Sequence, residues 1–191
     1  MPRERARRAG RSAARSLPEV LRDPRCYGPD VKKVRLAETH VSWVFLTGRY
    51  AYKVKKPVKL PFLDFSSLQL RKHFCDEELR VNRRLAPELY LGVVPIGGTA
   101  ASPRIGRKPA FEYAVKMREF SSDARLDKRL TANRVPRAAV ADFGESLASF
   151  HSSLPAVRGI RSAEIASAVL RNVDELAALL GGKLQIKALH A

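Results

Sequence analysis

The stretch from His40 to Pro57, HVSWVFLTGRYAYKVKKP, constrains the fold of this chain more than any other. It holds two runs of β-forming residues joined by Thr47-Gly48-Arg49, and a glycine between two such runs is typical of a hairpin turn. Because side chains alternate between the two faces of a strand, Lys53 and Lys55 share one face of the second run. Two lysines side by side fit either a solvated sheet edge or a surface that binds anions.

One long helix is expected after the hairpin, over roughly Ser67 to Leu85. Asp64 and Ser66 are the candidates for its N-cap, because short polar side chains accept hydrogen bonds from the free N–H groups of a first helical turn. Apolar residues of this segment recur at helical spacing and form a stripe that consists of Leu70, Phe74, Val81 and Leu85. We expect this stripe to face the core.

Glu77 and Glu78 flank the apolar stripe, one on each edge, at about 100° per residue. An acid so close to a buried face needs a cationic partner or retained water, because an unpaired buried charge is costly. Two interpretations stay open at this point. Either both carboxylates reach solvent beside the arginines of the same helix, or one of them meets a lysine of the hairpin.

The remaining elements segregate along the chain. Further strands are expected at Val31–Arg35, Tyr90–Ile96 and Ala110–Met117, and further helices at Arg125–Leu130, Arg137–His151 and Ser162–Leu180. Gly97-Gly98 is expected to begin a polar loop that continues to Lys108. Strands, one helix, more strands and then only helices favour an α+β fold over an alternating α/β fold.

The charge of the chain favours anionic partners. Lys and Arg number 36 against 19 Asp and Glu, which gives a formal net charge of +17. This excess fits nucleic acid, nucleotides, phosphorylated substrates or acidic lipid surfaces, and it does not choose among them. Part of the excess lies in the arginine-rich segment from Met1 to Ser16.

Cys26 and Cys75 lie far apart and in no CxxC or His/Cys pattern. The sequence therefore predicts reduced thiols rather than a disulfide framework or a structural zinc site. No apolar run approaches the length of about 18–20 residues that a membrane helix needs, and no apolar segment typical of a secretory signal follows the basic N-terminus. A cytoplasmic protein without a membrane partner is expected.

A strand lysine, a helix glutamate, two more strands and a polar hinge make up the skeleton of a protein-kinase-type small lobe. In that architecture the lysine holds nucleotide phosphates and the glutamate positions the lysine. The segments ETHVSWVFLTGRYAYKVKKPV, FLDFSSLQLRKHFCDEELRVNRRLAPELYLGVVPI, YAVKMREF and LASFHSSLP closely resemble the bacterial aminoglycoside-phosphotransferase-like kinases. The nearest subgroup is often fused to a C-terminal P-loop ATPase domain, and the resemblance covers roughly Val31 to Pro155.

This resemblance implies a site for ATP. It identifies Lys53 as the phosphate-binding lysine, with Lys55 as the alternative, and Glu78, seven residues before Leu85, as the positioning glutamate. The hinge beside the adenine would run from Met117 through Glu119 to Phe120. The loop over the phosphates would hold Thr39, His40 and Ser42, although it lacks the GxGxxG pattern. The implied division is a basic disordered tail at 1–24, a nucleotide-binding small lobe at 25–120 and a partial helical large lobe at 121–191.

The chain departs from such kinases in its catalytic parts. It contains neither the catalytic loop HGDxHxxN nor the later aspartate that holds Mg²⁺, and Gly181-Gly182-Lys183-Leu184 does not match the P-loop pattern GxxxxGK[ST]. His151 and His190 are not assigned a catalytic role. The expectation is a truncated or degenerate relative that binds ATP and does not transfer phosphate alone, with Mg²⁺ bound only if the missing half is supplied.

Two other functions stay open. The charge suggests a nucleic-acid-binding module, although the arginines are spread along the chain rather than grouped around aromatic residues. A non-catalytic interaction protein with a kinase-like scaffold is the other alternative. The sequence does not name a small-molecule phosphate acceptor, and apolar stripes on Arg137–His151 and Ser162–Leu180 suggest self-association.

Overall fold

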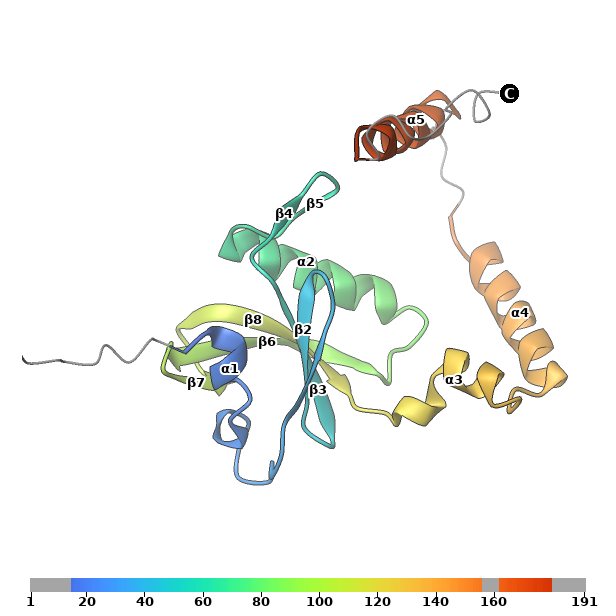
Figure 1. Ribbon diagram of the computed structural model, residues 1–191. Helices are drawn as coiled ribbons and strands as arrows, with labels where there is room; N and C mark the ends of the chain where they lie inside the picture. Colours follow the sequence, from blue (N-terminus) through green and yellow to red (C-terminus); the bar gives the residue numbers. More distant parts are fainter. Residues whose placement is uncertain (1–14, 156–161, 180–191) are drawn as a thin grey trace, which may run out of the picture. The chain divides into compact units, whose positions relative to one another are not determined.

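The computed structural model describes residues 15–155 and 162–179 (Figure 1). The chain forms two compact units, Met1–Lys128 and Arg129–Ala191, so that the division falls later than the expected boundary at residue 120. The first unit contains every strand of the described residues and the long helix expected after the hairpin. In the described residues of the second unit the regular elements are all helices, and the α+β class is therefore confirmed.

A six-stranded antiparallel sheet forms the centre of the first unit, with the strand order β1-β2-β3-β8-β6-β7. Its strands are β1 (Arg35–Glu38), β2 (Ser42–Leu46), β3 (Tyr50–Lys55), β6 (Tyr90–Thr99), β7 (Ser102–Ile105) and β8 (Ala110–Arg118). A separate two-stranded hairpin joins β4 (Lys59–Leu60) to β5 (Leu63–Asp64). Strand β3 pairs with β8 rather than with a strand that directly follows it, and the long helix α2 lies in the intervening stretch of chain.

The expected hairpin is confirmed as β2 and β3. Ser42 pairs with Lys55 at its open end and Leu46 pairs with Ala51 next to the turn. Gly48 has a φ of +93°, a conformation that residues with a side chain rarely adopt. The Thr47 hydroxyl donates a hydrogen bond of 2.8 Å to the carbonyl of Tyr50, which closes the turn.

Two strand predictions were wrong in extent. The first strand was expected at Val31–Arg35, but β1 begins at Arg35, which is the residue that faces the last residue of β2. Strand β6 continues through Gly97, where a loop was expected, and pairs with β7. A Cβ at Gly97 would lie 2.3 Å from the carbonyl oxygen of Arg107, so glycine here permits close backbone approach within a strand rather than ending it.

Helix α2 (Leu68–Asn82) lies along the sheet, on β8 and β6 (Figure 1). Its N-cap is Ser67, whose hydroxyl accepts a hydrogen bond of 3.2 Å from the N–H of Leu70. The expected caps were therefore wrong: the Asp64 carboxylate instead accepts hydrogen bonds from the N–H and hydroxyl of Ser66. Ser67 caps the helix because its hydroxyl lies nearest the free N–H groups of the first turn of α2.

The buried face of α2 also differs from the expected apolar stripe. Val81 and Leu85 are 47% and 61% exposed, whereas Arg71 and Cys75 are buried. Glu78 continues the same face at helical spacing from Arg71 and Cys75. The side of α2 that meets the sheet thus includes charged groups, which ion pairs with strand residues satisfy.

The opposite face of the sheet carries the apolar core. Its fully or largely buried members are Leu21, Cys26, Val34, Phe45, Tyr52, Val54, Ile96 and Ala114. Because neighbouring side chains of β3 alternate, Tyr52 and Val54 enter this core while Lys53 and Lys55 point toward α2.

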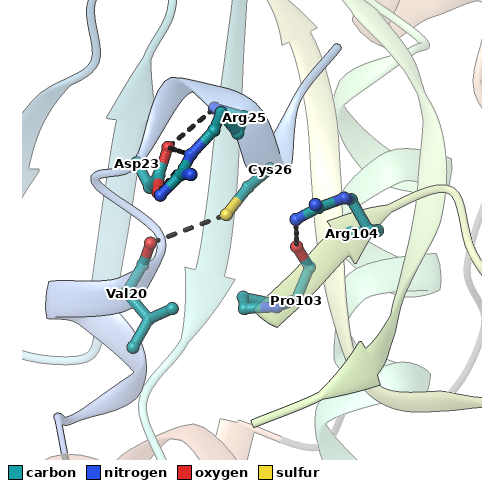
Figure 2. Close-up of polar contacts among 6 residues, drawn as sticks. All are labelled: Val20, Asp23, Arg25, Cys26, Pro103 and Arg104. Carbon is teal, nitrogen blue, oxygen red and sulfur yellow. Dashed lines mark hydrogen bonds and ion pairs between the residues drawn. The ribbon is translucent and has the colours of Figure 1, made fainter. Parts of the chain in front are cut away.

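The N-terminal segment of the described chain belongs to this core. Figure 2 shows polar contacts of this segment, among them those between Asp23 and Arg25. Helix α1 (Leu17–Val20) and the 3₁₀ turn η1 (Pro24–Cys26) bring in Leu21, which is fully buried. Asp23 forms an ion pair of 2.6 Å with Arg25, and hydrogen bonds from Arg25 lower the pKa of Asp23 to about 2. The folded unit therefore begins before residue 24, where the tail was expected to end.

The helices of the later chain match their expected positions closely. They are α3 (Leu126–Thr131), α4 (Arg137–Ser152) and α5 (Ser162–Leu179). The 3₁₀ turn η2 (Ser122–Ala124), where no helix was expected, precedes them, and Leu180, the expected end of the last helix, lies outside the described residues. Large apolar side chains on α4 and α5 are exposed, among them Phe143 at 65% and Ile165 at 57%. None of the helices in the described part of the chain is long and apolar enough to cross a membrane.

Candidate functional site

One glutamate of α2 holds two lysines of β3. Lys53 Nζ lies 2.8 Å from Glu78 Oε1, and Lys55 Nζ lies 2.8 Å from Glu78 Oε2. Of the two interpretations left open by the sequence, the second holds for Glu78, whose carboxylate meets two lysines of the hairpin. Glu77 points elsewhere and pairs with Arg80 at the helix surface.

The two lysines differ in exposure. The Lys55 side chain is 6% exposed, and its ammonium also lies 4.8 Å from the ring centre of Phe65. The Lys53 side chain is 29% exposed, while the Glu78 side chain between them is 13% exposed. Lys53 is therefore the lysine that a molecule in solvent can reach.

Two ammonium groups share one carboxylate at this site. Burial alone would raise the pKa of Glu78, but hydrogen bonds from Lys53 and Lys55 outweigh burial and place the pKa below its ordinary value. The carboxylate is thus ionised at neutral pH and balances one of the two ammonium groups. The charges of this site also act on Tyr90 of β6. Burial and the negative charge of Glu78 raise the pKa of Tyr90, while the positive charge of Lys53 lowers it.

A second ion pair, between Arg71 of α2 and Glu112 of β8, also fixes α2 to the sheet. Arg71 Nε lies 2.8 Å from Glu112 Oε2 of β8, and both side chains are largely buried. Arg71 also donates hydrogen bonds to the carbonyls of Phe65 and Ser66, which fixes the chain that enters the helix. Burial raises the pKa of Glu112, although the Tyr113 N–H and Arg71 act in the opposite direction. The anchor holds α2 in the position from which Glu78 reaches β3.

The residues expected over the phosphates form a tight turn between β1 and β2. The Thr39 hydroxyl oxygen accepts a hydrogen bond of 3.0 Å from the N–H of Ser42, and the side chain of His40 is exposed. Ser42 belongs to β2 rather than to the loop, and its side chain is 1% exposed. Its Oγ has no hydrogen-bond partner among the described residues. Thr39 and His40 are accessible from solvent, and Ser42 is not.

The expected hinge residues have different surroundings. Met117 pairs with Ala51 of β3 on one side and with Tyr90 of β6 on the other, so it lies on the same face of the sheet as Lys53. The Glu119 carboxylate accepts hydrogen bonds of 2.6 Å from Arg35 and 2.7 Å from the N–H of Gly48. Glu119 therefore holds the hairpin turn, a role that no local sequence signal indicated.

Other candidate residues do not join this site. His151 is exposed in the last turn of α4. His190 and the segment 181–184 lie outside the described residues. Within residues 15–155 and 162–179, no three His, Cys, Asp or Glu side chains are grouped in a way that suits a metal ion.

Comparison with known proteins finds similarity to part of longer mycobacterial proteins. The uncharacterized protein Rv2004c and the uncharacterized protein MT2060, both of Mycobacterium tuberculosis, and the uncharacterized protein Mb2027c of Mycobacterium bovis are each 34% identical to it over 146 residues. The match covers 74% of this chain and 27% of each relative, so the chain spans about a quarter of their length. No protein-family model and no solved structure matches the chain.

Proposed function

We propose that the first unit binds ATP through its phosphates, with Lys53 as the direct ligand, as the small lobe of an aminoglycoside-phosphotransferase-like kinase does. The observation that carries the proposal is the Lys53–Glu78 ion pair, in which the ammonium remains 29% exposed beside a strand-to-helix contact. Two ammonium groups share one carboxylate, and the remaining positive charge suits a phosphate. A surface salt bridge with one lysine and one carboxylate has no net charge and would attract an anion less strongly.

The neighbouring surface suits a nucleotide base. Ala51, Met117 and Tyr90 lie across three adjacent strands on the face that carries Lys53. Ala51 is buried, and the other two side chains are half-buried. A flat ring can lie against such a surface while its phosphates extend toward the lysine.

The proposal is limited to nucleotide binding. Phosphoryl transfer also needs a base that orients the acceptor hydroxyl and carboxylates that hold Mg²⁺. The pattern HGDxHxxN does not occur in this sequence, so we assign no transfer step and no acceptor to these residues. Mg²⁺ would accompany the nucleotide rather than occupy a site built by this unit.

The test is a titration of the full chain with a fluorescent ATP analogue in the presence of Mg²⁺. We expect saturable binding that Lys53→Met weakens about tenfold or more, because the substitution removes a charge-assisted contact. Lys72→Met is the matched control, since Lys72 is a partly exposed lysine paired with Asp76 on α2. Absence of binding, or equal affinity of the Lys53 variant and the unaltered chain, contradicts the proposal.

Nucleic acid is the second candidate partner, favoured by the net charge of +17. Binding of this kind neutralises many phosphates and therefore weakens steeply with added salt. The same titration with a labelled single-stranded oligonucleotide separates the two functions. Nucleic-acid binding is indicated if the affinity falls steeply with salt and does not depend on Lys53.

A further inference from the structure

We propose that Lys55 is a positioning residue, which stays paired with Glu78 when Lys53 turns to the nucleotide phosphate. This inference rests on the proposed function and adds a second lysine with a different task. Lys53 would exchange one partner for another, whereas Lys55 would keep Glu78 ionised and α2 docked throughout.

The need for a second lysine follows from the burial of Glu78. Its side chain is 13% exposed. If Lys53 were the only partner of Glu78, movement of the Lys53 side chain to a phosphate would leave this largely buried carboxylate unpaired. An unpaired charge in such a position opposes binding, because the cost of desolvation is no longer offset.

Lys55 is held so that it does not follow Lys53. Its ammonium has Glu78 Oε2 at 2.8 Å and the ring of Phe65 at 4.8 Å, and its side chain is 6% exposed. On the adjacent strand it faces Ser42, which is itself buried. A lysine enclosed in this way has no path to a ligand in solvent, so its contribution is to hold Glu78.

The carboxylate geometry allows the two lysines to act separately. Lys53 contacts Oε1 and Lys55 contacts Oε2, so that the loss of one hydrogen bond leaves the other intact. Once Lys53 is paired with phosphate, Lys55 and Glu78 form a neutral pair. The helix then keeps its ion pair to β3 in both the free and the bound state.

The test compares nucleotide affinity among three variants of the full chain, namely Lys55→Met, Glu78→Gln and the double variant. We expect Lys55→Met to weaken binding about tenfold, because the Glu78 carboxylate then has no cationic partner once Lys53 moves to the phosphate. Glu78→Gln in the same chain is expected to restore most of that loss, since no charge is left behind. A residue that served only to fill space would not be rescued by removal of the Glu78 charge.

A second measurement uses the unaltered chain and does not depend on how the variants fold. Acetylation of lysine amines, followed by mass spectrometry, is expected to show Lys53 protected by ATP and Lys55 unreactive with or without ATP. ATP-dependent protection of Lys55 overturns the inference, as does an unchanged affinity in a folded Lys55→Met variant. In either case binding that depends on Lys53 leaves the proposed function standing, whereas loss of ATP binding by the unaltered chain removes both.

Discussion

Arg71 of α2 and Glu112 of β8 form an ion pair of 2.8 Å in which both side chains are at least nine-tenths buried. Truncation of one partner leaves the other charge buried without compensation. We therefore expect Arg71→Met to lower the free energy of unfolding by about 3–5 kcal/mol, measured by urea denaturation.

Arg80→Met is the control on the same helix, because Arg80 pairs with Glu77 at the surface and its loss should leave stability unchanged. Replacing both Arg71 and Glu112 with methionine should recover much of the loss, since no buried charge remains. Equal stability of Arg71→Met and Arg80→Met would show that the buried pair does not anchor α2.

Glu119 ties the end of β8 to the hairpin turn through Arg35 and the N–H of Gly48. Glu119→Ala removes both hydrogen bonds, and we expect it to lower the free energy of unfolding by about 1–3 kcal/mol. Hydrogen exchange of the N–H of Gly48 should accelerate as well. Glu38→Ala, which removes an exposed carboxylate paired with Lys56, provides the comparison; a similar effect of both variants would contradict the role of Glu119.

The stability of the chain should depend on pH through Glu78. Hydrogen bonds from both lysines outweigh burial and hold the folded pKa of Glu78 below 4.5. Its stabilising contribution is thus complete above about pH 4.5 and is lost as pH falls through the lower folded pKa. Glu112 has a raised pKa and acts in the opposite direction, but it is present in both proteins of the comparison.

Thermal unfolding of the unaltered chain and of Glu78→Gln between pH 7 and pH 3 checks this prediction. We expect the unaltered chain to unfold at the higher temperature near neutral pH and the difference to shrink in acid. A difference that is constant across this range would mean that the Glu78 carboxylate does not titrate as its contacts imply.

Gly97 and Gly92, both in β6, should respond differently to alanine. A Cβ at Gly97 would lie 2.3 Å from the carbonyl oxygen of Arg107 and 2.6 Å from that of Pro109, whereas a Cβ at Gly92 would meet nothing within 4 Å. We expect Gly97→Ala to cost about 1–3 kcal/mol or more, as other overpacked sites do. Gly92→Ala should be tolerated, and denaturant unfolding of the two variants side by side decides the matter.

Both cysteines should resist thiol reagents in the folded protein. Cys26 and Cys75 are 3% and 0% exposed, and burial raises the pKa of Cys75 to about 12. Since the thiolate is the reactive species, iodoacetamide should label Cys75 only when the first unit opens. The labelling rate should rise with urea in parallel with unfolding; rapid labelling in native buffer would contradict the buried position of Cys75.

Several features of this protein follow from the local order of its residues. Alternation along β3 placed Lys53 and Lys55 on one face, and the glycine at position 48 defined the turn before them. The α+β order and the ends of α4 were also readable, because helical periodicity and a terminating Ser-Ser-Leu-Pro segment are local signals. These features need no knowledge of what lies across the sheet.

The burial of individual groups and the accessibility of each lysine depend instead on contacts between distant parts of the chain. Apolar periodicity pointed to Val81 and Leu85 as inward residues, but the inward face of α2 carries Arg71 and Glu78. Their partners lie on β3 and β8, far away in the chain, and no pattern within the helix reveals them. A charged group can face a sheet only when a distant residue offsets its desolvation, and that pairing is a property of the folded chain.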